Sequence, residues 1–185
     1  MTYLERANEL AILIRENSVL TGDFVLASGT SSNIYLDCRK VLLTPRGLRL
    51  ASDLVAELVQ DSIKNIDSVG GMAAGAIPLV SGSLLSLERF KPSIRGFFVR
   101  KEPKSYGTQK SLEGSFRPGD RVLLLEDVVT TGKSLESCVD VVTRMGGIVE
   151  KVISLVDRSD PSGSVRRKFD KFESVLSIAD ILKTV

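Results

Sequence analysis

The sequence predicts an α/β fold, in which a central, mostly parallel sheet is flanked by helices and carries a small N-terminal hood. Apolar, strand-like runs alternate with stretches of helical periodicity along most of the chain, which is typical of a parallel sheet with helices on both faces. The chain has 185 residues, of which 43% are hydrophobic, and no internal repeat or linker-like segment. These features fit one compact domain over residues 1–185.

The first part of the chain predicts the hood. A capping-box pattern at Thr2 precedes apolar residues at helical spacing, so a helix is expected over 3–16. Two short strand-like runs follow at 24–29 and 33–39, joined by a turn. We expect the hood to comprise about residues 1–40, together with elements from the C-terminal end.

The rest of the chain alternates strands and helices. A Thr-Pro pair at 44 and 45 begins a helix whose apolar periodicity continues to Val59. Strands are expected at 66–70, 95–99, 121–126, 148–156 and near 173–178. Helices are expected at about 76–89 and 133–145, and on each side of the last strand.

The most informative segment is VLLLEDVVTTGKS, residues 122–134. A buried strand leads into Glu126 and Asp127 and then into a small Thr-Thr-Gly turn before a helix, the usual place for a ligand in an open α/β sheet. The turn offers backbone N–H groups and hydroxyls to a monophosphate at the positive end of the helix. The acids are better placed against ribose hydroxyls, or near a divalent cation held by a second phosphate group. The implied ligand is a phosphorylated sugar.

Two other structures could account for this segment. One is a buried strand that ends in a capped helix, with both acids merely solvated. The other is a Walker A loop, because Gly132, Lys133 and Ser134 match its last three residues. That motif requires a glycine five positions before Gly132, where this chain has Asp127. The Walker A interpretation therefore fails.

Composition excludes several classes of function. A formal charge of +2 gives no case for a nucleic-acid or membrane partner, and no apolar run has the length of a membrane span. We expect a soluble, cytoplasmic protein. Cys38 and Cys138 fit neither a disulfide framework nor a metal-ligand spacing. The chain contains no histidine, which excludes Ser-His and Cys-His nucleophile pairs and leaves carboxylates, lysines, tyrosines and main-chain groups for chemistry.

Three further segments contain candidate binding residues. The small residues of 70–79 either let the backbone approach a ligand phosphate or pack a helix tightly on the sheet. A polar stretch over about 100–116 lacks periodicity and is either a solvated excursion or a mobile lid that closes over an anionic substrate. Its cations are Arg100, Lys101, Lys104 and Lys110. Arg158 either binds a planar anion through two guanidinium nitrogens or is a surface residue at a turn.

These segments resemble the type I phosphoribosyltransferases, and within them the orotate phosphoribosyltransferase family. VLLLEDVVTTGKS resembles the phosphoribosyl-diphosphate signature that many base specificities share. Four further segments resemble the orotate branch and follow the family's order over nearly the whole chain: FVLASGTSSNIYLDCRK, GGMAAGAIPL, VRKEPKSYGTQKSLEG and ISLVDR.

The resemblance implies the type I phosphoribosyltransferase fold and a specific reaction. In that reaction, the 5-phosphoribosyl group moves from 5-phospho-α-D-ribose 1-diphosphate (phosphoribosyl diphosphate) to N1 of orotate. The products are orotidine 5′-monophosphate and diphosphate, in de novo pyrimidine (UMP) biosynthesis. The resemblance also implies Mg²⁺ held mainly through the substrate, with no dedicated protein ligands, and a homodimer whose lid loop is shared across subunits.

The resemblance further assigns residues to roles. The residues expected in catalysis are Lys101, Lys104, Glu126 and Asp127. Those expected to contact phosphoribosyl diphosphate are Arg100, Lys101, Lys104, Tyr106, Glu126, Asp127, Val128, Val129, Thr130, Thr131, Gly132, Lys133 and Ser134. Those expected to contact orotate are Tyr35, Thr130 and Arg158.

Two alternative functions are kept beside this one. A phosphoribosyltransferase for another base is one, since Ala27 stands where enteric bacterial members place a lysine next to orotate. A non-catalytic regulator that senses a sugar phosphate is the other. A regulator would usually need a nucleic-acid surface or an added domain, and the sequence predicts neither. The cations of the lid also favour catalysis over simple binding.

Overall fold

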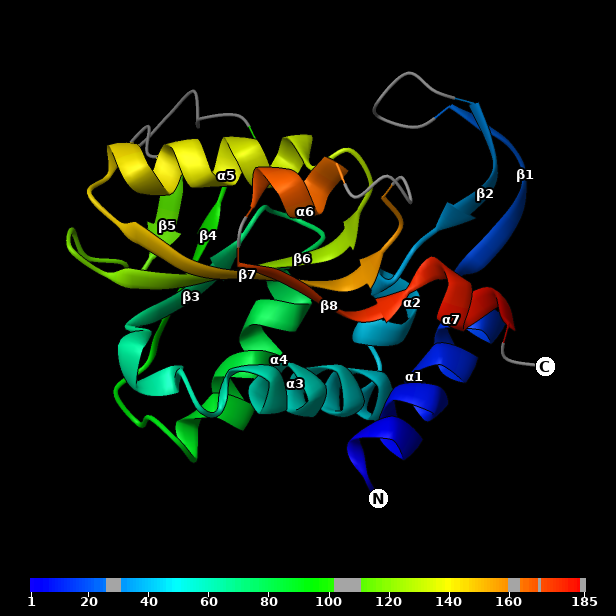
Figure 1. Cartoon of the computed structure of the whole chain (residues 1–185), viewed down its shortest axis with the longest axis horizontal. Coiled ribbons are helices and arrows are strands. Elements are labelled where there is room, and N and C mark those ends of the chain that lie inside the picture. Colours follow the sequence, from blue (N-terminus) through cyan, green and yellow to red (C-terminus); the bar gives the residue numbers. More distant parts are fainter. Residues whose placement is uncertain (26–30, 102–110, 160–163, 170, 184–185) are drawn as a thin grey trace.

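The computed structural model describes residues 1–25, 31–101, 111–159, 164–169 and 171–183. Its centre is a six-stranded sheet with the strand order β5-β4-β3-β6-β7-β8 (Figure 1). Neighbouring strands are parallel except at β5, which pairs with β4 in the antiparallel direction. The strands are β3 (Ser68–Gly71), β4 (Arg95–Val99), β5 (Leu112–Gly114), β6 (Arg121–Val129), β7 (Ile148–Asp157) and β8 (Phe172–Ser177). The predicted α/β class with a mostly parallel sheet is confirmed.

Helices cover both faces of this sheet. Figure 1 shows α5 and α6 over one face, and α3 and α4 over the other, with α1 beside α3. The helices are α1 (Tyr3–Ser18), α2 (Arg39–Leu42), α3 (Pro45–Val59), α4 (Ile77–Glu88), α5 (Lys133–Arg144), α6 (Ser164–Lys168) and α7 (Ile178–Lys183), with a 3-10 turn at Ile63–Asn65. Among the described residues, no helix has the length and apolarity needed to cross a membrane.

Strand β6 is buried on both of its faces. Val122 and Leu124 belong to the core beneath α5, whereas Leu123 and Leu125 belong to the core beneath α3 and α4. Successive side chains of a strand point to opposite faces, so this apolar run fills both cores. The packing on both sides holds β6 in register, and the strand therefore delivers Glu126 and its neighbours to one defined point of the sheet edge.

The N-terminal hairpin forms a separate, two-stranded antiparallel sheet of β1 (Val19–Val25) and β2 (Ser31–Leu36). Strand β1 follows α1 directly, so it begins earlier than the predicted strand at 24–29. The capping box at Thr2 is present, and α1 extends two residues beyond the expected end at residue 16. Helix α7 packs against α1, so the C-terminal end joins the N-terminal elements (Figure 1).

Two short elements were not predicted. Helix α2 has four residues, too few for a helical period to be visible in the sequence. Strand β5 has three residues, lies within the predicted lid and pairs with the edge of β4. Residues 102–110 of the predicted lid lie outside the described part of the chain.

A close approach at Gly71 joins β3 to the helix that follows. A Cβ atom at residue 71 would lie 2.6 Å from Cβ of Ala76, and closer still to the carbonyl oxygen of Leu125. We expect Gly71→Ala to lower the free energy of unfolding by about 2 kcal/mol, as overpacking does in other cores. Urea denaturation measures this. Ser81→Ala, at an exposed position of α4, is the control and should change it by less than about 0.5 kcal/mol. Equal midpoints for both variants would contradict the close approach.

Candidate active site

A groove of about 620 Å³ opens at the carboxyl edge of the central sheet. This volume is within the range of small-molecule sites, and the carboxyl edge is where open α/β sheets bind ligands. Strand β2 and the start of α2, the β3–α4 loop, the ends of β4 and β6 and one face of α5 all contribute to its wall. The lining residues are Tyr35, Leu36, Asp37, Arg39, Met72, Ala73, Gly75, Arg100, Lys101, Glu126, Asp127, Lys133, Ser134, Ser137, Asp140, Val141 and Arg144.

A smaller cavity of about 70 Å³ lies next to the groove, at the turn between β6 and α5. It is lined by Glu126 and by the continuous segment 128–135. Gly132 caps α5 with φ at +79°, in the left-handed region that favours glycine over residues with a Cβ atom. This conformation turns the chain from the strand into the helix, and the first N–H groups of α5 are left facing this cavity. The turn that the sequence predicts as a phosphate site therefore borders a small cavity at a helix N-terminus.

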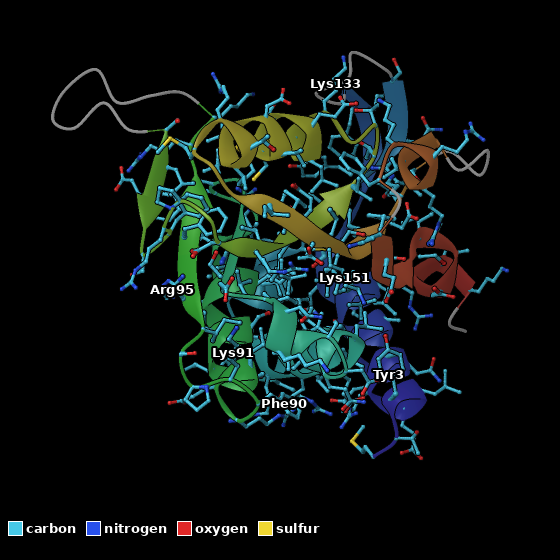
Figure 2. The ribbon with its side chains drawn as sticks, turned by 60° about the vertical axis from the view of Figure 1, so that its left-hand side comes forward. Tyr3, Phe90, Lys91, Arg95, Lys133 and Lys151 are labelled. Carbon is cyan, nitrogen blue, oxygen red and sulfur yellow. The ribbon has the colours of Figure 1, made fainter. Side chains whose placement is uncertain are left out.

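Lys133 lines both cavities and marks the position of the site. Figure 2 shows it at the end of α5 that lies toward the hood, whereas Lys91 and Arg95 lie at the other end of the sheet.

The acid pair lies between the two cavities. Glu126 lines both of them and is 7% exposed, and Asp127 lines the groove. Burial raises the pKa of Glu126 well above its ordinary value, and the neighbouring Asp127 raises it further. Burial also raises the pKa of Asp127, but backbone N–H groups, the hydrogen bond with Glu126 and the positive charge of Arg39 oppose that rise.

The pKa of Glu126 is raised further than that of Asp127, so a proton taken up by the pair favours Glu126. Oε2 of Glu126 is buried and has no hydrogen-bond partner among the described residues, which would be costly for an ionised carboxylate. Asp127, the acid of the pair whose pKa is raised less, lines the groove.

Arg100 and Lys101, two of the predicted diphosphate contacts, line the groove at the end of β4. Nε of Arg100 donates to Oε1 of Glu113 at 2.7 Å, and its guanidinium lies 5.6 Å from the ring centroid of Phe98. The backbone N–H of Arg100 donates to the carbonyl of Ser111 at 2.8 Å, which closes the base of the predicted lid. The other two predicted lid contacts, Lys104 and Tyr106, lie outside the described residues.

The three predicted orotate contacts lie at the same edge but in different surroundings. Tyr35 lines the groove, and its ring packs 5.6 Å from that of Phe24. Thr130 lines the smaller cavity. Nη2 of Arg158 donates to the carbonyl of Ile34 at 2.9 Å, so this side chain ties the end of β7 to the hood.

Several lining residues were missed by the sequence analysis. Asp37 and Arg39 follow β2 and form a bidentate ion pair, with Nε to Oδ1 at 2.7 Å and Nη2 to Oδ2 at 3.1 Å. The polar run DCRK after a strand-like segment was their signal in the sequence. Helix α5 adds a polar face at the spacing of helical turns, made of Ser137, Asp140 and Arg144.

No group of three or more potential metal ligands occurs among the described His, Cys, Asp and Glu residues. Mg²⁺ commonly keeps several waters and binds through one or two carboxylates together with substrate phosphates, and Glu126 and Asp127 offer carboxylate oxygens at the groove.

Comparisons with known proteins agree with this geometry, although no family model matches the chain. The orotate phosphoribosyltransferase of Thermococcus gammatolerans is 36% identical over 172 residues, which cover 92% of this chain and 88% of that protein. The orotate phosphoribosyltransferase of Methanothermobacter thermautotrophicus is 37% identical over 178 residues, or 95% of this chain and 94% of that protein.

A solved structure of an orotate phosphoribosyltransferase also resembles this chain. The orotate phosphoribosyltransferase of Mycobacterium tuberculosis in complex with 5-phospho-α-D-ribosyl 1-diphosphate has a TM-score of 0.75 and 31% identity, and the match covers 96% of this chain and 92% of that one. The predicted type I phosphoribosyltransferase fold is confirmed by this likeness. By sequence and by structure, this chain belongs to the orotate phosphoribosyltransferase family.

Proposed function

We propose that this chain transfers the 5-phosphoribosyl group of phosphoribosyl diphosphate to N1 of orotate, giving orotidine 5′-monophosphate and diphosphate in de novo pyrimidine (UMP) biosynthesis. The observation that carries the proposal is the position of the acid pair. Glu126 and Asp127 lie between a cavity at a helix N-terminus and a groove with cations at its rim. Complex formation between the Mycobacterium tuberculosis relative and phosphoribosyl diphosphate supports it.

Each part of the donor has a complementary surface. The 5-phosphate is held by the segment Thr130 to Ser134, where backbone N–H groups and the dipole of α5 favour an anion. Asp127 accepts hydrogen bonds from the ribose hydroxyls, and a protonated Glu126 both donates and accepts. The diphosphate lies toward Arg100 and Lys101 at the end of β4.

Charge development in the reaction matches these surfaces. As N1 of orotate bonds to C1 of the ribose and loses its proton to solvent water, the bond from C1 to the diphosphate oxygen breaks and its electron pair leaves with the diphosphate. Positive charge grows on the ribose, which the anion Asp127 stabilises, and negative charge grows on the leaving group, which the cations of the rim stabilise. None of these steps requires a histidine, and the chain has none.

Mg²⁺ is part of the proposal as a cation held mainly through the substrate. When bound, it supplies positive charge that neutralises the diphosphate. Arg100 and Lys101 then bind and orient the same group from the end of β4, and Tyr35, Thr130 and Arg158 orient orotate.

The assembly and location are proposed on the same basis. One domain with a hood and a lid over about 100–116 would close the groove against water, and a homodimer would share that lid across subunits. The hairpin β1–β2 lies beside the groove, and this position supports the proposal of a hood. A cytoplasmic location is supported by the free, buried thiols of Cys38 and Cys138, since structural disulfides are typical of oxidising compartments.

One assay tests the function and its alternatives. The protein is incubated with phosphoribosyl diphosphate and Mg²⁺ in the presence of orotate, uracil, adenine or hypoxanthine, and nucleotide formation is followed by absorbance and chromatography. We expect turnover with orotate alone. Turnover with another base would make the chain a phosphoribosyltransferase of different specificity. Binding of the donor without turnover of any base would identify a sensor.

The ion pair of Arg100 and Glu113 leads to a prediction about donor affinity. Both side chains are partly exposed, and the diphosphate must compete with Glu113 for the guanidinium. We expect Glu113→Gln to lower the KM for phosphoribosyl diphosphate about threefold with kcat unchanged, the scale of a partly exposed ion pair. Glu173→Gln, which removes the partner of Lys151 at 2.9 Å near the opposite edge of the sheet, is the matched control and should leave KM unchanged. A raised KM in Glu113→Gln would contradict the competition.

A further inference from the structure

The loop between β3 and α4 contains a glycine in direct contact with the acid pair. Gly75 lines the groove, and a Cβ atom at residue 75 would lie 2.7 Å from each carboxylate oxygen of Asp127 and 2.9 Å from its Cγ atom. Among the described glycines, Gly75 is the one at which a side chain would meet a charged group. Its φ lies outside the left-handed region, so the contact with Asp127, and not the backbone conformation, requires a glycine at this position.

The backbone on both sides of Gly75 is held in place. The N–H of Ala73 donates to the carbonyl of Val99 at 2.7 Å, which ties the loop to the end of β4. Ala76 is fully buried and packs closely against Gly71 of β3. A side chain added at residue 75 therefore cannot be accommodated by a movement of the loop away from the acid unless these contacts are lost.

The backbone that carries Asp127 is held in place as well. Strand β6 pairs with β7 on both sides of this residue, with Glu126 opposite Ser154 and Val128 opposite Val156. An added Cβ atom would therefore displace the carboxylate itself. Rotation of the carboxylate does not relieve the contact, because its carbon atom also lies within 2.9 Å. To reach an ordinary contact distance of 3.4 Å, the carboxylate would have to retreat by about 0.7 Å.

We infer that Gly75 is a positioning residue of the active site, because the absence of a side chain at residue 75 sets the place of the Asp127 carboxylate in the groove. The inference rests on the proposed function, in which Asp127 accepts hydrogen bonds from the ribose hydroxyls. A misplacement of about 1 Å costs about 100-fold in rate in other enzymes. The role differs from both roles that the sequence offers for residues 70–79, which are approach to a phosphate and packing of a helix.

A double-mutant cycle of Gly75→Ala and Asp127→Ala tests the inference by steady-state kinetics with orotate, phosphoribosyl diphosphate and Mg²⁺. We expect Gly75→Ala alone to lower kcat about 10- to 100-fold, because the carboxylate is displaced by somewhat less than 1 Å. The Asp127→Ala background contains no carboxylate to displace. There, Gly75→Ala should change the remaining activity by less than about twofold, since the two substitutions act through one contact.

Gly82→Ala is the matched control for overpacking. A Cβ atom at residue 82 of α4 would meet Oγ of Ser52 and lie 2.6 Å from Cδ1 of Leu48, and none of these three residues lines the groove. We expect a lower free energy of unfolding, measured with urea, and a kcat within about twofold of the wild type. Equal losses of kcat in Gly82→Ala and Gly75→Ala would overturn the inference, because overpacking would then explain both.

The outcomes separate the inference from the proposed function. In an active wild type, an unchanged kcat in Gly75→Ala would overturn the inference, as would the same loss from this substitution in the Asp127→Ala background. An inactive wild type would instead overturn the proposed function. Calorimetric titration with phosphoribosyl diphosphate and Mg²⁺ then decides the inference: an affinity that Gly75→Ala weakens only when Asp127 is present supports it, and any other pattern refutes it.

A circular dichroism spectrum and a thermal melt accompany each variant. If Gly75→Ala alone does not fold, the double variant with Asp127→Ala decides the inference. Recovery of the fold in the double variant supports the contact between residue 75 and the carboxylate, and a double variant that also fails to fold refutes it.

Discussion

Replacing Asp127 by Asn should lower kcat about 100- to 1,000-fold with little change in the fold, the range found when one preorganised electrostatic group is removed from an active site. The pKa of Asp127 is raised less than that of Glu126, and Asp127 lines the groove in which the proposed reaction develops positive charge on the ribose. The amide keeps the shape of the side chain but removes the charge. Steady-state kinetics and a thermal melt measure the two effects.

Glu126→Gln is the matched control, because it changes the neighbouring acid by the same single atom. Burial and the neighbouring Asp127 raise the pKa of Glu126 well above its ordinary value, which favours the protonated form, so a neutral amide is a smaller change there than at Asp127. We expect a loss of about tenfold or less, the scale of one altered hydrogen bond. Equal losses in the two variants would contradict the division of charge within the pair.

Replacing Lys104 by Ala is expected to have the second largest effect. The resemblance to the family assigns this lysine to the diphosphate, where negative charge grows as the bond to C1 breaks. We expect kcat to fall about 100-fold and the affinity for substrate to change far less, because the interaction strengthens in the transition state. Pre-steady-state and steady-state kinetics separate the two. A kcat within a few-fold of the wild type would contradict the role assigned to Lys104 in the lid.

A mixing experiment tests whether the lid acts in trans. Lys104→Ala subunits are re-formed with Asp127→Asn subunits, each variant alone being nearly inactive. In a mixed dimer, one site would combine an intact Asp127 with an intact Lys104 from its partner. With random pairing, about a quarter of the wild-type activity should return, since half of the dimers are mixed and each has one intact site. No recovery in verified mixed dimers would contradict a shared lid.

The fold and the turn between β6 and α5 could be predicted because their signals are local in the sequence. The run 122–125 fills both cores through strict alternation, and such a run implies a buried parallel strand wherever the chain places it. The Thr-Thr-Gly turn before α5 depends on local features alone, since the left-handed Gly132 and the helix N-terminus lie within a few residues of each other.

The parts that were missed depend on contacts between distant segments. Strand β5 exists through its pairing with the edge of β4, and its three residues show no strand pattern of their own. Arg39 belongs to the site because α2 lies opposite β6, which no spacing in the sequence reveals. The pKa values of Glu126 and Asp127 are raised to different extents by burial and by their separate neighbours, whereas the sequence shows only two adjacent acids of similar kind.

A crystal structure of the protein with orotidine 5′-monophosphate tests the central claim most directly. We predict that the 5′-phosphate lies against the backbone N–H groups of residues 130–134, with the ribose hydroxyls within hydrogen-bond distance of Asp127 and the base toward Tyr35. A nucleotide bound with its phosphate away from this turn, or its ribose away from the acid pair, would contradict the account.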